Sequence, residues 1–335
     1  MGNISDFTEE EFIEARENLK LILMGEVPSV EKPFAVLTGG QPGAGKTTIA
    51  RIYEDLTYGD IVFINGDDFR KRHPRFLKIY NEHGGDFVSY TSEFSGRMVQ
   101  EMIDYAREKR LNMVVEGTLR TTSVPNSTRS FLQESGYKVN LAVMVVRPEI
   151  SYLSTLKRYN QMLERGTFGR LTSKSDHDFV VNSIVENLDK IYSENKFDDI
   201  LLFNRNKDCL YRFSECKDVN PSVLMHEEFS RELNQQEKDD ILRFYSNYVD
   251  RKDIEFVLNG GFSFNVKINA LGTSSSEMKF FTGLSDDGIP VELDLNAPFR
   301  EKAERKKKLE EAKQKGKTGD KPVDLGDNSG PGGGR

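Results

Sequence analysis

The chain of 335 residues has few cysteines and histidines, and their spacing argues against disulfides and metal sites. The two cysteines, Cys209 and Cys216, are too few for a disulfide framework and fit the reduced thiols of a cytoplasmic protein. No histidine follows them at a zinc-site spacing, and the four histidines of the chain show no metal-ligand spacing among themselves. We therefore expect a cytoplasmic protein without a disulfide framework or a zinc site.

Long apolar runs and an excess of positive charge are also missing. No run approaches the roughly 20 apolar residues that a membrane helix needs, and the polar, acidic segment 1–11 is unlike a secretory signal. Acidic residues outnumber basic ones, 54 to 47, which argues against nucleic acid as the main partner. An apolar content of 37% beside a charged content of 30% indicates that part of the chain is poorly packed.

A glycine-rich segment is the most informative feature that the sequence does contain. The apolar run 34–37 leads into the pattern G-x-x-x-x-G-K-T, which is filled by Gly40, Gly45, Lys46 and Thr47. Glycines allow backbone N–H groups to surround phosphate oxygens, and a following helix presents its positive end to the same anion. Lys46 would neutralise β- and γ-phosphate charge, and the Thr47 hydroxyl would bind Mg²⁺. The predicted nucleotide contacts are Gly40, Gln41, Pro42, Gly43, Ala44, Gly45, Lys46 and Thr47.

Short apolar runs alternate with helical patterns after this segment. Each run is short and continuous, as in strands buried on both faces of a parallel sheet. We expect strands at 34–37, 60–65, 113–115, 141–146 and 200–203, and helices at 7–23, 48–56, 95–109, 127–134, 149–163, 178–192 and 235–248. Strand–helix alternation behind a phosphate loop predicts a P-loop kinase-like α/β domain over residues 1–249, with a parallel sheet flanked by helices.

The composition changes towards the C-terminus. Residues 262–270 alternate apolar and polar side chains, and apolar segments at 278–284 and 289–295 flank an Asp-Asp-Gly turn. We interpret residues 250–298 as a small β-rich appendage of unknown role. Residues 299–335 are rich in Lys and Glu and then in Gly and Asp, which predicts a charged, largely disordered tail.

Carboxylates follow two of the predicted strands. Asp67 and Asp68 come after the second strand, which we expect beside the loop strand, and Glu116 follows the third. Ligands bind at the carboxyl ends of parallel strands. A carboxylate there can accept the proton of a hydroxyl that attacks the γ-phosphate, or it can cap the next helix. We assign Asp67 as the base and Asp68 as the cap, and Glu116 could hold Mg²⁺ through water. Polar groups just beyond, on Thr118 and Arg120, could bind substrate oxygens.

Phosphoryl transfer also needs positive charge on the γ-phosphate oxygens. Spacing alone does not single out one of Arg158, Arg165 and Arg170, because an arginine is more often a surface residue. His177 is most simply a helix-start or packing residue.

Several segments together resemble the zeta toxin family of bacterial toxin–antitoxin systems, which includes the Pez-type toxins. The resemblance runs from about residue 5 to 215, and its specific segments are 39–47, 65–74, 116–125, 151–159 and 176–178. It implies an ATP- and Mg²⁺-dependent kinase that phosphorylates the 3′-hydroxyl of the amino sugar in UDP-N-acetylglucosamine, which blocks peptidoglycan synthesis. A small helical antitoxin is the implied partner.

The resemblance also assigns roles to single residues. It implies Lys46 as the phosphate lysine, Asp67 as the general base, and Arg158 and Arg170 as the arginines that hold the transferring phosphate. Sugar-nucleotide contacts are implied for Thr118, Arg120 and Thr128, with Asp67 and Glu116 beside them. One position departs from the family, because Gln100 stands where a substrate-contacting Glu is typical. Gln still forms hydrogen bonds but carries no charge, and Glu101 lies about 100° further around the helix.

Two other interpretations stay open. The chain could be a P-loop kinase for another hydroxyl, such as that of an antibiotic or a nucleic-acid 5′ end. It could also be a nucleotide-gated binding protein with little chemistry, whose C-terminal part recruits partners.

Overall fold

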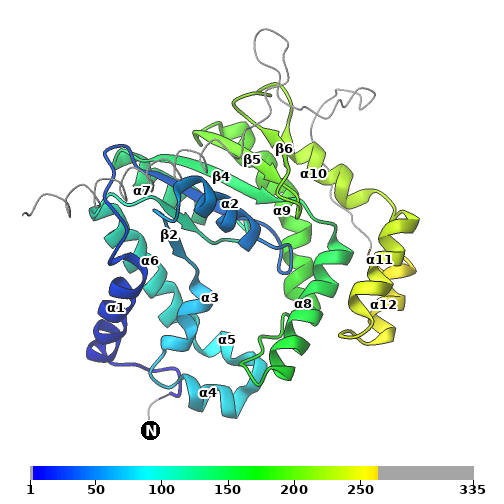
Figure 1. Ribbon diagram of the computed structural model, residues 1–335, viewed down its shortest axis with the longest axis horizontal. Coiled ribbons are helices and arrows are strands. Elements are labelled where there is room, and N and C mark those ends of the chain that lie inside the picture. Colours follow the sequence, from blue (N-terminus) through cyan, green and yellow to red (C-terminus); the bar gives the residue numbers. More distant parts are fainter. Residues whose placement is uncertain (1–2, 263–335) are drawn as a thin grey trace, which may run out of the picture. The chain divides into compact units, whose positions relative to one another are not determined.

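A six-stranded sheet forms the centre of the computed structural model, which describes residues 3–262, all within the first of the chain's two units, Met1–Thr282 (Figure 1). The strands in chain order are β1 (Phe34–Gly39), β2 (Val62–Ile64), β3 (Met113–Val115), β4 (Lys138–Met144), β5 (Asp199–Phe203) and β6 (Cys209–Arg212). Their order in the sheet is β2-β3-β1-β4-β5-β6, and only β6 runs antiparallel to its neighbour. The predicted α/β fold and its five parallel strands are confirmed, and β6 is an addition.

The position of β2 differs from the expectation. β1 pairs with β3 and β4, so β3 separates β1 from the edge strand β2. The expectation that the strand before Asp67 lies beside the loop strand is therefore wrong. The connection through helix α2 (Thr47–Thr57) skips one position in the sheet, which β3 later fills. Glu116, at the end of β3, is consequently the strand-end carboxylate nearest the loop.

Helices cover both faces of the sheet. The larger apolar cluster packs α1 (Glu9–Met24), α6 (Ser92–Glu108), α7 (Ser123–Glu134), α9 (Lys174–Glu194) and α10 (Pro221–Ser230) against one face. A smaller cluster packs α2 against the other. Within β1, Ala35 and Leu37 belong to the larger cluster and Val36 to the smaller, which explains the continuous apolar run. In residues 3–262 we find no helix with the length and apolar character that crossing a membrane requires.

A separate apolar cluster joins α8 (Pro148–Glu164) to two C-terminal helices, α11 (Gln235–Tyr245) and α12 (Arg251–Leu258). We call α11 and α12 the C-terminal helix pair. Residues 251–258 are thus helical, although we expected them to begin a β-rich appendage. The strands predicted within 262–295 and the tail predicted at 299–335 lie outside the described residues, apart from Phe262.

A string of short helices follows β2. These are α3 (Gly66–Phe69), η1 (Arg70–Arg72), α4 (Phe76–His83), η2 (Gly84–Asp86) and α5 (Phe87–Tyr90). The sequence analysis missed them, because elements of three to eight residues are too short to show a helical period. Their aromatic side chains form a cluster of their own with Phe168, which comes from the loop between α8 and α9.

Candidate active site

The glycine-rich loop connects β1 to α2 in the strand–turn–helix arrangement that its sequence predicts. Gly43 and Gly45 have φ angles of +77° and +91°, a backbone region that favours glycine. A Cβ atom on Gly43 would also overlap the carbonyl oxygen of Ser151 on α8. Helix α2 begins at Thr47, so its free N–H groups and positive dipole end lie at the loop. The backbone here can therefore bind an anion without a side chain.

Gln41 is completely buried and connects the loop to α8 and α9. Its Nε2 donates to the carbonyl oxygen of Val146 (2.5 Å) and to Ser151 Oγ (3.1 Å). Ser151 Oγ lies 2.8 Å from Nε2 of His177, whose Nδ1 lies 3.2 Å from Oδ1 of Asp178. Burial lowers the pKa of His177. A neutral ring can donate from Nδ1 to Asp178 and accept from Ser151 at Nε2. His177 is thus a packing residue, as expected, and it also supports the loop.

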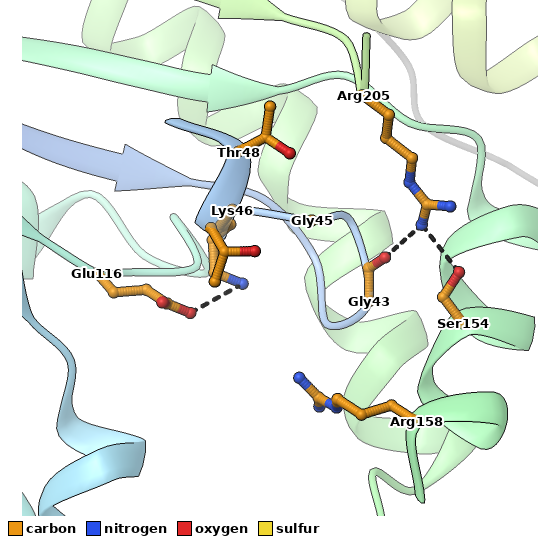
Figure 2. A pocket seen from close by; sticks show the side chains of 9 residues that line it. Gly43, Gly45, Lys46, Thr48, Glu116, Ser154, Arg158 and Arg205 are labelled. Atoms are coloured by element: carbon orange, nitrogen blue, oxygen red, sulfur yellow. Dashed lines mark hydrogen bonds and ion pairs between the residues drawn. The ribbon is translucent and has the colours of Figure 1, made fainter. Parts of the chain in front are cut away.

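A cavity of about 400 Å³ opens beside the loop (Figure 2). Its lining residues are Gly43, Gly45, Lys46, Thr47, Thr48, Glu116, Ser154, Arg158 and Arg205. The structure therefore brings together six residues that the sequence analysis selected, namely Gly43, Gly45, Lys46, Thr47, Glu116 and Arg158. The charged lining groups are three cations and one carboxylate, so the cavity suits an anionic ligand.

Lys46 lies between the loop and the end of β3. Its Nζ is 3.6 Å from Oε1 of Glu116 and donates to the carbonyl oxygen of Gly40 at 3.2 Å. Burial lowers the pKa of Lys46, Glu116 opposes this effect, and the charges of Arg158 and Arg170 add to it. An anion bound among these cations would stabilise the charged amine. The ion pair with Glu116 is long, so a phosphate could replace or share it.

Arg158 projects from α8 towards the loop without a hydrogen bond or ion pair to any residue in the described part of the chain (Figure 2). Burial lowers its pKa, and the charge of Glu116 opposes that effect. A guanidinium group that is partly withdrawn from water and has no carboxylate partner within reach is well suited to bind phosphate oxygens.

The cavity also fits the predicted Mg²⁺ contacts. Thr47 is exposed at the cavity, and its hydroxyl and the Glu116 carboxylate are the hard oxygen ligands that Mg²⁺ prefers. Within residues 3–262 no group of three or more His, Cys, Asp or Glu side chains could hold a metal.

Asp67 lies on α3, and arginines bind both of its carboxylate oxygens. Arg70 Nε donates to Oδ1 at 3.1 Å, and Arg170 Nη1 donates to Oδ2. The Asp67 side chain keeps 36% of its surface exposed and the Arg170 side chain 27%, so solvent reaches this pair. Arg170 is also close enough to Lys46 to lower the pKa of that amine, which relates the Asp67 pair to the cavity.

The cap of α3 differs from the prediction. Asn65 is the N-cap, because its Oδ1 accepts from the Asp67 N–H at 3.1 Å. Asp68, which we expected to cap the helix, instead accepts a hydrogen bond from the Asn65 amide at 3.0 Å. Asn is as good an N-cap as Asp and precedes both carboxylates in the chain. Both aspartates are therefore free of capping, and only Asp67 is paired with arginines.

Arg170 belongs to a loop that is anchored on the short helices after β2. The Phe168 ring contacts the rings of Phe76 and Tyr80, each with centroids 4.9 Å apart. The Gly169 N–H donates to the Tyr80 hydroxyl at 3.1 Å. The loop after α8 is thus fastened to α4, and this contact holds Arg170 next to Asp67. In Figure 1 these short helices and α8 lie opposite each other.

The predicted sugar contacts are more scattered. Thr118 lies beside the loop, since its carbonyl oxygen accepts from the Gly40 N–H at 3.3 Å. Arg120 is exposed, and Thr128 is half-buried on α7. Gln100 is exposed on α6 and donates to Asp104 at 3.3 Å, while Glu101 is turned away towards Arg16 of α1. Within residues 3–262, none of these side chains forms a hydrogen bond or an ion pair with Lys46, Asp67, Arg158 or Arg170.

Some residues of the site carried no sequence signal. Arg205 and Ser154 line the cavity, and Arg70 binds Asp67. Arg205 lies outside the segments that carry the family resemblance, whereas Ser154 and Arg70 lie within two of them, 151–159 and 65–74, without an assigned role. The Asn65-Gly-Asp-Asp-Phe-Arg70 segment is a partial exception, because Arg70 lies one helical turn after Asp67.

A parallel sheet with a phosphate-binding loop after its central strand defines an α/β protein of the P-loop class. The comparison with protein families is more specific. Residues 21–215 match the model of the zeta toxin family, and the chain belongs to that family, whose members are kinases of toxin–antitoxin systems.

Known relatives agree with this assignment. The chain is 41% identical to the toxin PezT of Streptococcus pneumoniae serotype 4 over 238 residues, which covers 70% of this chain and 93% of that protein. It is 35% identical to the toxin zeta of Streptococcus pyogenes, covering 71% and 83%. A solved structure of the PezAT chromosomal toxin–antitoxin system of Streptococcus pneumoniae aligns with a TM-score of 0.66 at 36% identity and covers 77% of this chain and 100% of that one.

Proposed function

We propose that this protein transfers the γ-phosphoryl group of ATP to the 3′-hydroxyl of the amino sugar in UDP-N-acetylglucosamine. The observation that carries the proposal is the pairing of an electropositive cavity at the P-loop with a carboxylate, Asp67, held by Arg170 near that cavity. The first feature suits a triphosphate, and the second suits an acceptor hydroxyl whose proton must be removed.

The residues divide the reaction between them. The loop amides and Lys46 would bind the β- and γ-phosphates, and Thr47 with Glu116 would hold Mg²⁺, which neutralises phosphate charge when bound. The acceptor oxygen attacks the γ-phosphorus while its proton passes to Asp67, and the bond from the γ-phosphorus to the β–γ bridging oxygen breaks to release ADP. Arg158 and Arg170 would stabilise the charge that spreads over the transferring group.

The cellular role follows from the substrate. Phosphorylating UDP-N-acetylglucosamine in the cytoplasm would withdraw the precursor of peptidoglycan, so we infer that the protein is a toxin. We also infer a small helical antitoxin of the epsilon or Pez type as its partner. The similarity to a chain from the PezAT toxin–antitoxin system supports this inference.

The test is a reaction of the purified full-length protein with Mg-ATP and UDP-N-acetylglucosamine, followed by mass spectrometry. We expect a phosphorylated sugar nucleotide and ADP in equal amounts. Lys46→Ala should lose the product, because an alanine cannot neutralise the phosphates. A wild-type protein that binds ATP but forms no phosphorylated sugar nucleotide would contradict the proposed acceptor.

One observation favours a second acceptor. Gln100 offers an amide where the family typically has a carboxylate, and its side chain is exposed rather than fixed in the site. A kinase for another small-molecule hydroxyl is therefore the alternative. A panel of UDP-hexoses and unrelated hydroxyl compounds separates the two, since a preference for UDP-N-acetylglucosamine supports the main proposal and a preference for another compound supports the alternative.

A further inference from the structure

Arg205 contacts the backbone of the phosphate-binding loop at Gly43 and Ala44. It lies in the turn between β5 and β6, and its Nη2 donates to the carbonyl oxygen of Gly43 while Nε donates to that of Ala44 at 3.3 Å. The aliphatic part of its side chain lies over Gly45, where its Cγ would be 3.8 Å from a Cβ at that position. Figure 2 shows the guanidinium group reaching down to the loop.

These contacts fix the orientation of two peptide groups. No peptide bond in the described residues is cis, so each carbonyl points opposite to the N–H of the next residue. When the carbonyl oxygens of Gly43 and Ala44 are bound by Arg205, the N–H groups of Ala44 and Gly45 face the other way. The N–H of Ala44 donates to the carbonyl oxygen of Gln41 at 3.1 Å. The N–H of Gly45 remains directed away from the guanidinium group, as an anion-binding loop requires.

Helix α11 of the C-terminal helix pair holds Arg205 in this position. Tyr245 of α11 has its hydroxyl 2.8 Å from Ser154 Oγ and 3.5 Å from Arg205 Nη1, and Arg205 Nη2 donates to the same Ser154 Oγ at 2.9 Å. The Tyr245 ring is buried with Tyr152 and Ile241 in the cluster between α8 and α11. This chain of contacts runs from a helix outside residues 21–215 to the backbone of the loop.

Charge supports the same interpretation. Within residues 3–262 Arg205 has no carboxylate partner, since its hydrogen bonds all go to carbonyl and hydroxyl oxygens. Its positive charge therefore remains available at the cavity. Neutral acceptors position the guanidinium group and leave its charge uncompensated, whereas a carboxylate partner would cancel that charge.

We propose that Tyr245, through Ser154 and Arg205, is a positioning residue that sets the affinity of the phosphate-binding loop for the nucleotide. We call Tyr245, Ser154 and Arg205 the loop support. The C-terminal helix pair is then a working part of the nucleotide site, and anything that displaces it would weaken ATP binding. The inference rests on the proposed function only in taking ATP as the nucleotide.

The experiment measures ATP binding by calorimetry, with Mg²⁺ and without an acceptor, on the full-length protein. Tyr245→Phe removes one hydroxyl and keeps the buried ring, so we expect the Kd for ATP to rise about three- to tenfold. Arg205→Ala should raise it further. Tyr248→Phe is the matched control, because its hydroxyl makes no hydrogen bond within the described residues, and it should bind ATP like the wild type.

A double-mutant cycle distinguishes positioning from a general loss of stability. If Tyr245 acts through Arg205, adding Tyr245→Phe to Arg205→Ala should change the Kd little, whereas independent effects would multiply. In steady state, Tyr245→Phe should raise the KM for ATP and leave the KM for the acceptor unchanged. Ser154→Ala, which removes the central hydroxyl, gives a second and independent variant if Arg205→Ala does not fold.

Two results would overturn the proposal. Unchanged ATP affinity in both Tyr245→Phe and Ser154→Ala would show that the contacts do not matter, and multiplicative effects in the cycle would show that Tyr245 does not act through Arg205. Failure of the proposed function would give a different experimental result from failure of this inference. A wild-type protein that binds ATP but phosphorylates no sugar nucleotide leaves the binding results, and thus this inference, intact.

Discussion

The two sides of the candidate site are built in different ways. The nucleotide side, residues 40–47, is one continuous segment that presents mainly backbone groups, together with the side chain of Lys46. The proposed acceptor side, Asp67 with Arg70 and Arg170, combines side chains from α3, η1 and the loop after α8. A binding site made from one continuous segment can be recognised in the sequence. A site assembled from side chains of separate elements cannot, because it depends on packing between residues that are far apart in the chain.

The ion pairs on the two sides of the site also differ, in how closely the charged groups are bound. Lys46 and Glu116 are 3.6 Å apart, a loose pair that a phosphate could enter. Both carboxylate oxygens of Asp67 are bound by arginines, Oδ1 by Arg70 and Oδ2 by Arg170. An incoming hydroxyl would therefore approach a carboxylate that two arginines already bind but that solvent still reaches. Nucleotide binding and acceptor binding should thus respond to different substitutions, and the following three predictions test this separation.

The largest effect is expected from Asp67→Asn. An amide keeps the shape of the side chain but cannot accept the proton, so kcat should fall by roughly 10²- to 10⁴-fold. The Kd for ATP should stay within about twofold, because the nucleotide side is untouched. Asp68→Asn is the matched control, since Asp68 contacts the Asn65 amide rather than an arginine. Growth inhibition by Asp67→Asn at wild-type strength would instead favour a nucleotide-gated binding protein.

A smaller loss is expected from Arg170→Lys. Lysine retains the positive charge but lacks the planar fork of donors, so kcat should fall about tenfold to a hundredfold, less than the roughly 10³- to 10⁵-fold contribution of an arginine in GTPases. Arg165→Lys, at the exposed end of α8, should be neutral. The comparison of the two sides would be wrong if Arg170→Lys weakened ATP binding as much as it lowered kcat.

The smallest effect is expected from Tyr80→Phe. This change removes the hydroxyl that accepts from Gly169 N–H and leaves the ring on Phe168, so the Arg170 loop should loosen without unfolding. A lost hydrogen bond of about 1 kcal/mol corresponds to roughly a fivefold lower kcat. Tyr90→Phe, whose ring stacks on His83, serves as the control. Equal kcat values for both variants would show that the anchor does not position Arg170.

The same difference explains what could be predicted from the sequence. The loop, the five parallel strands and Lys46 follow from local patterns, because glycine conformation and apolar runs are properties of neighbouring residues. Arg158 and Arg170 were indistinguishable from Arg165 by spacing, and only the family resemblance separated them. Arg205 and Tyr245 had no signal at all, since their roles depend on β5, α8 and α11 meeting in space. The place of β2 at the sheet edge was missed for a similar reason, because strand order is not written in any one segment.

The crowding at Gly43 changes how the loop pattern should be read. The pattern G-x-x-x-x-G-K-T leaves this position open to any amino acid, but a side chain here would overlap the Ser151 carbonyl oxygen, and its φ of +77° already disfavours one. The pattern gives the residues that phosphate binding requires of the loop. Packing against α8 adds a second requirement, which is the absence of a side chain at position 43. Position 43 therefore requires glycine in this fold, although the motif alone does not specify it.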